Sequence, residues 1–287
     1  MPQLQNRCRL RLADPDSHGM SPGETGWRQC LCLVVRCVLG AAMAVGAAAS
    51  CRRDGSTGQD PDLASVAHLE RGRSLRKRGR YREAIAEFDK AIQLDPNWAM
   101  PYCSRGMAHH QLSEHDQAIA DLTKAVELAP QYAIAYGNRG FVHREIGELE
   151  KAIADYTEAI RLDPEFATAY ADRGLMHFNT GKYAQAVADC TEAIRLRPGL
   201  ARAYASRGLA HAKVYKLGKA IADCTRAIEL EPKNAEFRAN RAVLYFWRVR
   251  DVAKAWVDVR ACQALGGELP PAFLEALRQA SETQGVP

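Results

Sequence analysis

The feature of this chain that most limits its fold is a tandem repeat. The block from Ala133 to Phe166 is followed directly by a second block, Ala167 to Leu200, with the same pattern of apolar, small and charged residues. This frame of 34 residues extends in both directions, giving blocks at 65–98, 99–132, 133–166, 167–200, 201–234 and 235–264. A unit this short cannot bury its own apolar face, so each block has to stack on its neighbours.

Each block divides into two helices. Its apolar and small residues recur at helical spacing, and one turn position interrupts that spacing. The turn position holds Gly79, Ser113, Gly147, Gly181 and Tyr215. A proline near the end of each block lacks the amide proton that a helix interior needs, so it ends the second helix. These prolines are Pro96, Pro130, Pro164, Pro198 and Pro232.

Small residues recur where the two helices of a block would face each other. The first helix has glycine at its eighth position, although glycine in a helix interior costs about 1 kcal/mol relative to alanine. We expect a close approach of the two backbones to offset this cost, because the second helix has alanine at two positions. The glycines are Gly72, Gly106, Gly140, Gly174 and Gly208, and the first-position alanines are Ala84, Ala118, Ala152, Ala186 and Ala220.

These glycines, alanines and closing prolines, together with one position of the second helix that holds an aromatic residue or its substitute, resemble the tetratricopeptide repeat over residues 65–264. That position holds Phe88, Leu122, Tyr156, Cys190 and Cys224. The resemblance implies an all-α fold, a right-handed α-solenoid of about six helix-turn-helix repeats. The sixth block is less regular, because Ala242 replaces the glycine and one extra residue precedes its second helix. Residues 265–287 include the segment Pro270 to Ala280, which we expect to form a capping helix.

The N-terminal residues 1–51 have a different pattern. Arg28 and Arg36 precede a short apolar run from Cys37 to Ala49, which is the layout of a secretory signal. An uncleaved membrane anchor is the alternative, although it would place Arg36 in the bilayer at a cost of about 2.5 kcal/mol or more. Residues 1–51 are therefore predicted to be a signal peptide or anchor, and 52–64 a flexible linker.

The end of the apolar run resembles a bacterial lipobox. In the sequence Ala48-Ala49-Ser50-Cys51, Cys51 would become the lipidated first residue of the mature protein, although leucine usually stands where Ala48 stands. An ordinary cleaved signal remains an alternative, and a true start at Met20 would make the preceding residues an artefact of gene calling. The predicted location is the cell envelope, either membrane-attached or periplasmic, and the alternative location is the cytoplasm.

Cysteine and histidine also recur from block to block. Cys190 and Cys224 replace the aromatic residue of the second helix, and we expect each to be a small buried hydrophobe. A disulfide between them is the alternative in an oxidising compartment. One position of the first helix holds His109, His143, His177 and His211. Adjacent blocks are too far apart for two imidazoles to share a zinc ion, so we expect local hydrogen bonds, no metal and no cofactor.

One positive and one negative charge recur together in every block. The first helix has Arg71, Arg105, Arg139, Arg173, Arg207 and Arg241 at one position. The second helix has Glu87, Asp121, Asp155, Asp189, Asp223 and Asp258 at another. We expect these charges to pair, within a block or across the junction, and to orient the two helices. Because an exposed pair contributes at most about 1 kcal/mol, the expected role is geometric more than stabilising.

The family resemblance places the first helices on the inner wall of a groove. The candidate groove residues are Met107, His110, Asn138, Phe141, Leu175, Phe178, Leu209, Asn240, Phe246 and Trp247. An apolar row with polar edges suits an extended or helical peptide segment, with aromatic side chains as anchors. Part of the row, including the position of Phe141, is alternatively core between repeats. The groove lacks the basic and asparagine residues with which chaperone-binding members hold a C-terminal carboxylate, so no chaperone-tail adaptor is predicted.

The first block is strongly basic between Arg71 and Arg82. Beside a lipidated Cys51, this patch would lie near anionic headgroups and favour membrane association. Nucleic-acid binding is not predicted, because Tyr81 is the only aromatic residue among these charges, and a solvated helix face is the remaining interpretation.

No motif of an active site is present in the sequence, and no small-molecule substrate is predicted. The predicted function is therefore a non-catalytic scaffold for protein–protein interaction at the bacterial cell envelope. The alternative is a soluble cytoplasmic adaptor or regulator with an uncleaved anchor or a misread start.

Overall fold

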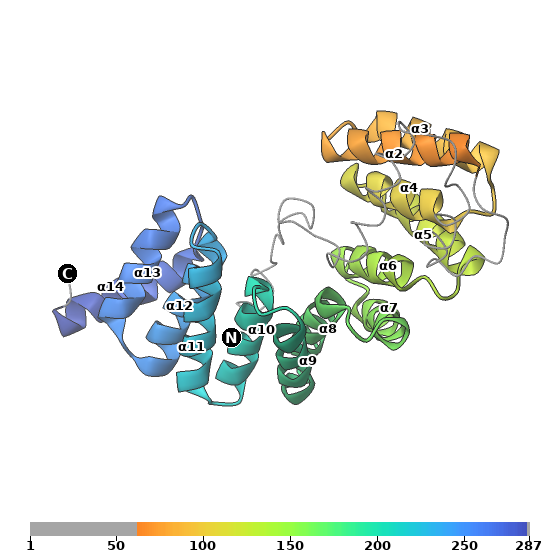
Figure 1. Ribbon diagram of the computed structural model, residues 1–287. Coiled ribbons are helices and arrows are strands. Elements are labelled where there is room, and N and C mark those ends of the chain that lie inside the picture. The colour runs from red at the N-terminus through yellow and green to blue at the C-terminus, as the bar shows by residue number, and fades with distance from the viewer. Residues whose placement is uncertain (1–61, 286–287) are drawn as a thin grey trace, which may run out of the picture. The chain divides into compact units, whose positions relative to one another are not determined.

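The computed structural model describes residues 62–285, and these residues form helices without any strand (Figure 1). The first helices of the repeats are α2 (Leu63–Lys77), α4 (Ala99–Gln111), α6 (Ala133–Glu145), α8 (Ala167–Asn179), α10 (Ala201–Lys213) and α12 (Ala235–Leu244). The second helices are α3 (Tyr81–Leu94), α5 (His115–Leu128), α7 (Leu149–Leu162), α9 (Tyr183–Leu196), α11 (Leu217–Leu230) and α13 (Val252–Ala264). From the second repeat onward, each first helix begins at the first residue of its predicted block.

The predicted signal or anchor, with Cys51, and nearly all of the predicted linker lie outside the described residues. α2 begins at Leu63, two residues before the first block. Of the helices between residues 62 and 285, none is long enough and apolar enough to cross a membrane.

The described chain forms two compact units, with the boundary between Ile146 and Gly147 in the third repeat. The N-terminal unit contains α2 to α6, and the C-terminal unit contains α7 to α14 (Figure 1). Within each unit every helix packs against the next along the chain, and first helices of adjacent repeats also touch, as α8 touches α10 and α10 touches α12. This pattern of contacts is typical of an α-solenoid, in which a repeat packs only against its neighbours.

The glycines of the first helices allow the close approach that the sequence predicts. A Cβ atom on Gly106 would lie 2.9 Å from Cγ of Leu122, and one on Gly174 would lie 2.7 Å from Sγ of Cys190. Both distances are well below carbon contact distance, so no larger residue fits without movement. The facing alanines are completely buried. The close packing of small residues is confirmed.

Cys190 and Cys224 are free thiols buried between the helices of their repeats, so they form no disulfide with each other. Burial raises the pKa of each thiol to about 12, with a smaller contribution from the neighbouring aspartates. The thiolate, which is the reactive form, is therefore disfavoured at neutral pH. Both cysteines act as small hydrophobic side chains, as predicted.

The extra residue of the sixth repeat is accommodated in a π-helical turn, η3 (Tyr245–Val249), which continues α12. A π-helical turn holds more residues than an α-helical turn, so it absorbs an insertion locally. Arg250 then leaves the helix with a left-handed φ of 64°. Arg241 and Asp258 keep the pairing of the other repeats although 17 residues separate them, compared with 16 between Arg207 and Asp223.

The last helix, α14 (Pro271–Gln284), covers the sixth repeat. Phe273 and Leu277 are almost fully buried in one cluster with Phe246 and Val259. The ring of Phe273 meets that of Phe246 edge-on, with 5.6 Å between centroids. The predicted capping helix, with proline at its start, is confirmed.

Candidate protein-binding surface

In four repeats, an arginine of the first helix pairs with an aspartate of the second helix of the same repeat. Four pairs make two hydrogen bonds each, with nitrogen–oxygen distances of 2.6 to 2.9 Å. They are Arg105–Asp121, Arg173–Asp189, Arg207–Asp223 and Arg241–Asp258. In the first repeat, Arg71 lies 3.3 Å from Glu87. The predicted pairing within a block is confirmed in these repeats.

The same arginines also bond to the second helix of the preceding repeat. Nη1 of Arg105 donates to Asp89 at 2.6 Å, and Nη1 of Arg241 donates to the hydroxyl of Thr225 at 2.8 Å. Arg139, whose predicted partner Asp155 belongs to the other unit, donates to Thr123 at 3.3 Å. Pairing thus occurs across the junction as well as within the block. Since the aspartates are nearly buried, removing one would cost more than losing an exposed pair.

The recurrent histidines pack against these pairs. Nε2 of His177 lies 3.7 Å from Asp189, and Nε2 of His211 lies 4.0 Å from Asp223, too far for hydrogen bonds. His109 bonds to Glu114 at 2.7 Å, so the predicted local hydrogen bond is found there. Burial lowers the pKa of His177 and His211, although the nearby aspartates act in the opposite sense. Between residues 62 and 285, no three His, Cys, Asp or Glu side chains are grouped to hold a metal ion.

In the N-terminal unit, the predicted groove residues pack the helices together. Met107 and Phe141 are each only 8% exposed and belong to one core cluster. The ring of His110 meets Phe141 edge-on at 5.0 Å, and the amide nitrogen of Asn138 donates to Sγ of Cys103 at 3.3 Å. First helices of adjacent repeats touch, so the side chains of this row lie between them.

The C-terminal unit leaves more of the predicted row accessible. Leu175 and Phe246 are buried, whereas Phe178, Leu209 and Asn240 are partly exposed. Trp247 is 41% exposed. The ten candidate groove residues therefore differ in exposure, and the accessible apolar ones lie on α8, α10 and η3. We call Phe178, Leu209, Asn240 and Trp247 the accessible groove residues.

Two arginines that sequence reasoning missed lie together beside α8 and α10. Arg202 reaches Asp172 at 3.4 Å, and its Nε is buried without an acceptor among the described residues. Burial and, to a smaller extent, the charge of Arg202 lower the pKa of Arg197. Both cations are half-buried, and Arg197 forms no ion pair with any residue from 62 to 285, so positive charge is left uncompensated and favours an anionic ligand group.

A signal for these arginines was present in the repeat itself. The position of Arg197 is acidic in three other repeats, as Asp95, Asp163 and Glu231. At the position of Arg202, the three preceding repeats have uncharged residues, Met100, Ile134 and Thr168. Both departures are visible when the blocks are aligned, but only the fold shows that they meet.

Glu236, in the first turn of α12, is an acid without a cationic partner among residues 62–285. Burial raises its pKa to about 7, while its hydrogen bond with Asn240 acts in the opposite sense and Glu231 adds to the rise. The start of a helix favours a carboxylate and also opposes the shift. At neutral pH the group is therefore close to half-protonated, and the charge of this part of the face changes near pH 7.

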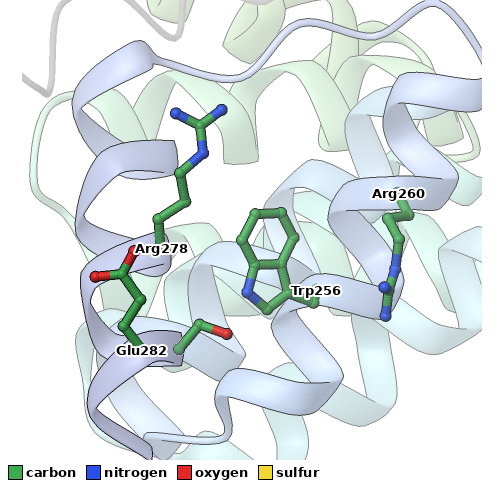
Figure 2. Close-up of a pocket in the computed structure, with 5 residues that line it drawn as sticks. Trp256, Arg260, Arg278 and Glu282 are labelled. Carbon is green, nitrogen blue, oxygen red and sulfur yellow. The ribbon is translucent and has the colours of Figure 1, made fainter. Parts of the chain in front are cut away.

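A separate shallow pocket of about 330 Å³ lies between α13 and α14, lined by Trp256, Arg260, Arg278, Ser281 and Glu282. Figure 2 shows the Trp256 indole facing α14, from which Arg278 and Glu282 project, with Arg260 on the other side. The indole nitrogen is buried without an acceptor among the described residues. The lining mixes both charges and selects no ligand class, so the functional argument stays with the helix faces.

The basic first repeat has many acidic neighbours. Arg73 pairs with Glu70 at 2.8 Å, and Arg80 pairs with Glu83. Glu87 contacts Lys90 at 2.7 Å as well as Arg71. Arg82 lies 3.7 Å from Glu114 of the second repeat. Much of the positive charge of this repeat is therefore compensated within the protein.

The paired helices, stacked repeat on repeat within each unit, define an all-α repeat protein of the kind that serves as an interaction scaffold. Residues 99–132, 167–200 and 201–234 match families described as tetratricopeptide repeat, and residues 72–113 and 142–181 match one described as TPR repeat. The chain belongs to the tetratricopeptide repeat family. No curated protein matches it by sequence.

Solved structures share the fold. The crystal structure of MamA is 30% identical, with a TM-score of 0.51, and the match covers 57% of this chain and 96% of that one. The pilF protein of Pseudomonas aeruginosa is 20% identical, with a TM-score of 0.67 and coverage of 76% and 99%. YrrB, described as a TPR protein with an unusual peptide-binding site, is 22% identical, with a TM-score of 0.51 and coverage of 62% and 91%.

Proposed function

We propose that this protein is a non-catalytic scaffold that binds a peptide or helix of a partner protein on the first helices of its C-terminal unit. The observation that carries the proposal is that Phe178, Leu209 and Trp247 remain accessible there, while the apolar members of the row in the N-terminal unit, Met107 and Phe141, are packed as core. Accessible aromatic and aliphatic side chains on a helix face are the usual anchors for a peptide segment.

The charge of this face narrows the chemistry of the segment. Arg202 contacts the carboxylate of Asp172 at 3.4 Å, and the charges of Arg202 and Arg197 repel each other. A partner with an acidic side chain would therefore satisfy these two arginines best. The partner segment would combine apolar anchors with at least one acid. YrrB supports the proposal only as an example of a peptide-binding site on the same fold.

The proposed location is the cell envelope. Its support is the signal-like run from Cys37 to Ala49 and the lipobox-like sequence that ends at Cys51. The N-terminus and the basic first repeat would then lie near the membrane. Fractionation with mass analysis of the N-terminus tests this part: a mature product that begins at lipid-modified Cys51 supports it. An intact N-terminus in the cytosol would favour the cytoplasmic adaptor instead.

Affinity capture followed by binding measurements tests the proposed groove. Proteins captured by the wild type are purified and titrated against the wild type, a Phe178→Ala/Trp247→Ala variant and a control, Val257→Ala, whose side chain is exposed on the second helix α13. We expect the double variant to bind at least about 10-fold more weakly, as anchor residues do, and the control to bind unchanged. Equal affinity of all three forms would refute the groove.

A further inference from the structure

Exposed cations on most helices of this protein are paired with a carboxylate three residues away. Examples are Lys124–Glu127, Arg161–Glu158, Arg195–Glu192 and Arg226–Glu229. Such pairs neutralise the charge locally and leave little for an external partner.

Among the cations of the C-terminal unit that do not follow this pattern, five lie near two of its turns. They lie around the turn between α10 and α11 and the turn after η3, and no ion pair is formed by them within residues 62–285: Lys213, Lys216, Lys219, Arg248 and Arg250. The sequence explains why, since it has no acid from 193 to 222 or from 237 to 250. The next acid, Asp251, is held by Lys254 at 2.9 Å and caps α13.

Apolar and aromatic side chains are exposed among these cations. Tyr215 is 75% exposed, Trp247 41%, Val249 40% and Val214 39%. The Arg248 guanidinium lies 5.0 Å from the centroid of the Tyr215 ring, so the two turns are in contact. We call residues 213–219 and 247–250 the turn edge.

The backbone of Tyr215 adds an independent observation. Its φ is 61°, in the left-handed region, where glycine stands at the same position in three other repeats. A bulky residue in that region costs about 1 kcal/mol or more. The side chain does not repay this cost by packing, because most of its surface is exposed. Strain of this kind at an exposed position indicates a role outside the fold itself.

We infer that the turn edge docks on the surface of an anionic lipid bilayer. Lysine and arginine near a membrane surface are attracted to acidic headgroups. Tyrosine and tryptophan favour the depth of the headgroups, where one end of the ring is apolar and the other is wet. The two valines distinguish this surface from one for single-stranded nucleic acid, where bases stack on aromatic rings and aliphatic side chains contribute little.

The inferred contact is peripheral and reversible. The described helices contain no membrane span, and only four apolar side chains are exposed on the turn edge. This contact shares only Trp247 with the proposed peptide groove, and its cations and Tyr215 lie outside the groove residues. It also differs from an N-terminal anchor, because all of its residues lie in the C-terminal unit.

Sedimentation with lipid vesicles tests the inference. The full chain, with Cys51→Ser in every sample to prevent lipidation, is mixed with vesicles of phosphatidylcholine alone or with 30% phosphatidylserine. We expect Lys216→Gln/Lys219→Gln/Arg248→Gln/Arg250→Gln to lose at least about 10-fold in partitioning to the acidic vesicles, since each cation contributes to the attraction. The matched control, Lys124→Gln/Arg161→Gln/Arg195→Gln/Arg226→Gln, removes four paired cations and should change partitioning less than about 2-fold.

A second variant separates the contact from folding. Tyr215→Gly/Trp247→Ala should lower partitioning to the acidic vesicles about 5-fold through loss of interfacial aromatics, while Tyr215→Gly alone should not lower the melting temperature. Equal partitioning of the wild type and the charge variant would overturn the inference. Tighter binding of an oligothymidine than of acidic vesicles at the same salt would also overturn it, and would assign the surface to nucleic acid.

Discussion

The first repeat and the turn edge are both rich in lysine and arginine, but their charges have different surroundings. Between Arg71 and Arg82 the cations have glutamates close by, and several form ion pairs with them. On the turn edge the cations are fewer and have no acidic partner among residues 62–285, and exposed rings stand between them. The comparison teaches that the density of basic residues in a sequence says less about available charge than the acids three residues away.

The largest effect is expected where a cation has the most buried partner. Asp258 is 1% exposed and accepts two hydrogen bonds from Arg241. Asp258→Ala should lower the free energy of unfolding by about 3 kcal/mol, because it leaves the guanidinium half-buried without its carboxylate. Urea unfolding measures the change. Arg250→Gln, which removes an unpaired cation, is the control, and a loss below about 1 kcal/mol in Asp258→Ala would contradict the role of the pair.

The comparison of paired and unpaired charges also applies to Glu236, an acid with no cationic partner among residues 62–285. Its folded pKa of about 7 lies above the ordinary value of 4.5, so the folded state keeps a proton that the unfolded state releases. Wild-type stability should therefore fall, relative to Glu236→Gln, as pH rises from about 4.5 to 7. The variant should be more stable by roughly 3 kcal/mol at pH 8 and about equal at pH 4.5. Thermal unfolding at both pH values checks this, and a difference independent of pH would contradict the shift.

Substitutions at the turn position between the two helices of a repeat test whether Tyr215 is a strained residue or a packed one. Tyr215 and Gly181 occupy it in adjacent repeats, both with positive φ. Tyr215→Gly should raise stability or leave it unchanged, whereas Gly181→Ala should lower it by about 1 kcal/mol, since alanine is strained at that φ. Differential scanning calorimetry of the two variants decides. If Tyr215→Gly destabilises the protein as much as Gly181→Ala does, the ring has a structural role.

The smallest effect tests the first repeat directly. Glu83→Gln/Glu87→Gln removes the acids that hold Arg80, Arg71 and Lys90. Freed cations should raise partitioning to vesicles with 30% phosphatidylserine by about 3-fold. Vesicle sedimentation measures this, with Glu127→Gln on α5 as a single-pair control. Unchanged partitioning would mean that the acids do not mask this repeat.

Much of the fold could be predicted because every block reports the same structure. The starts of the first helices, the pairing of Arg105 with Asp121 and its equivalents, and the helix at Pro271 all follow from residues that recur at fixed positions. A pattern that recurs in several blocks supports a structural prediction more strongly than the sequence of a single helix does. The stacking of about six helical repeats was therefore predictable from the sequence.

The binding surface was less accessible, because periodicity identifies a helix face without saying how closely the next helix approaches it. Met107 and Phe141 lie on the predicted row but are buried by that approach. Arg197 and Arg202 lie on either side of the short turn between α9 and α10, and the charge of Arg202 acts on Arg197 there. The turn edge depends on two acid-free stretches that are far apart in sequence, and Arg248 over Tyr215 shows that they meet. Lipidation of Cys51 stays a prediction.

The π-helical turn at Tyr245–Val249 has a consequence for how such arrays vary. One inserted residue in an α-helix would rotate every following side chain by about 100° around the axis. Here the five residues of the π-helical turn absorb the insertion. Asp258 of α13 therefore faces Arg241 as the corresponding aspartates face their arginines in the preceding repeats. An insertion inside one repeat therefore leaves intact the surface on which α14 packs. Such a protein can acquire local insertions without losing its capping helix.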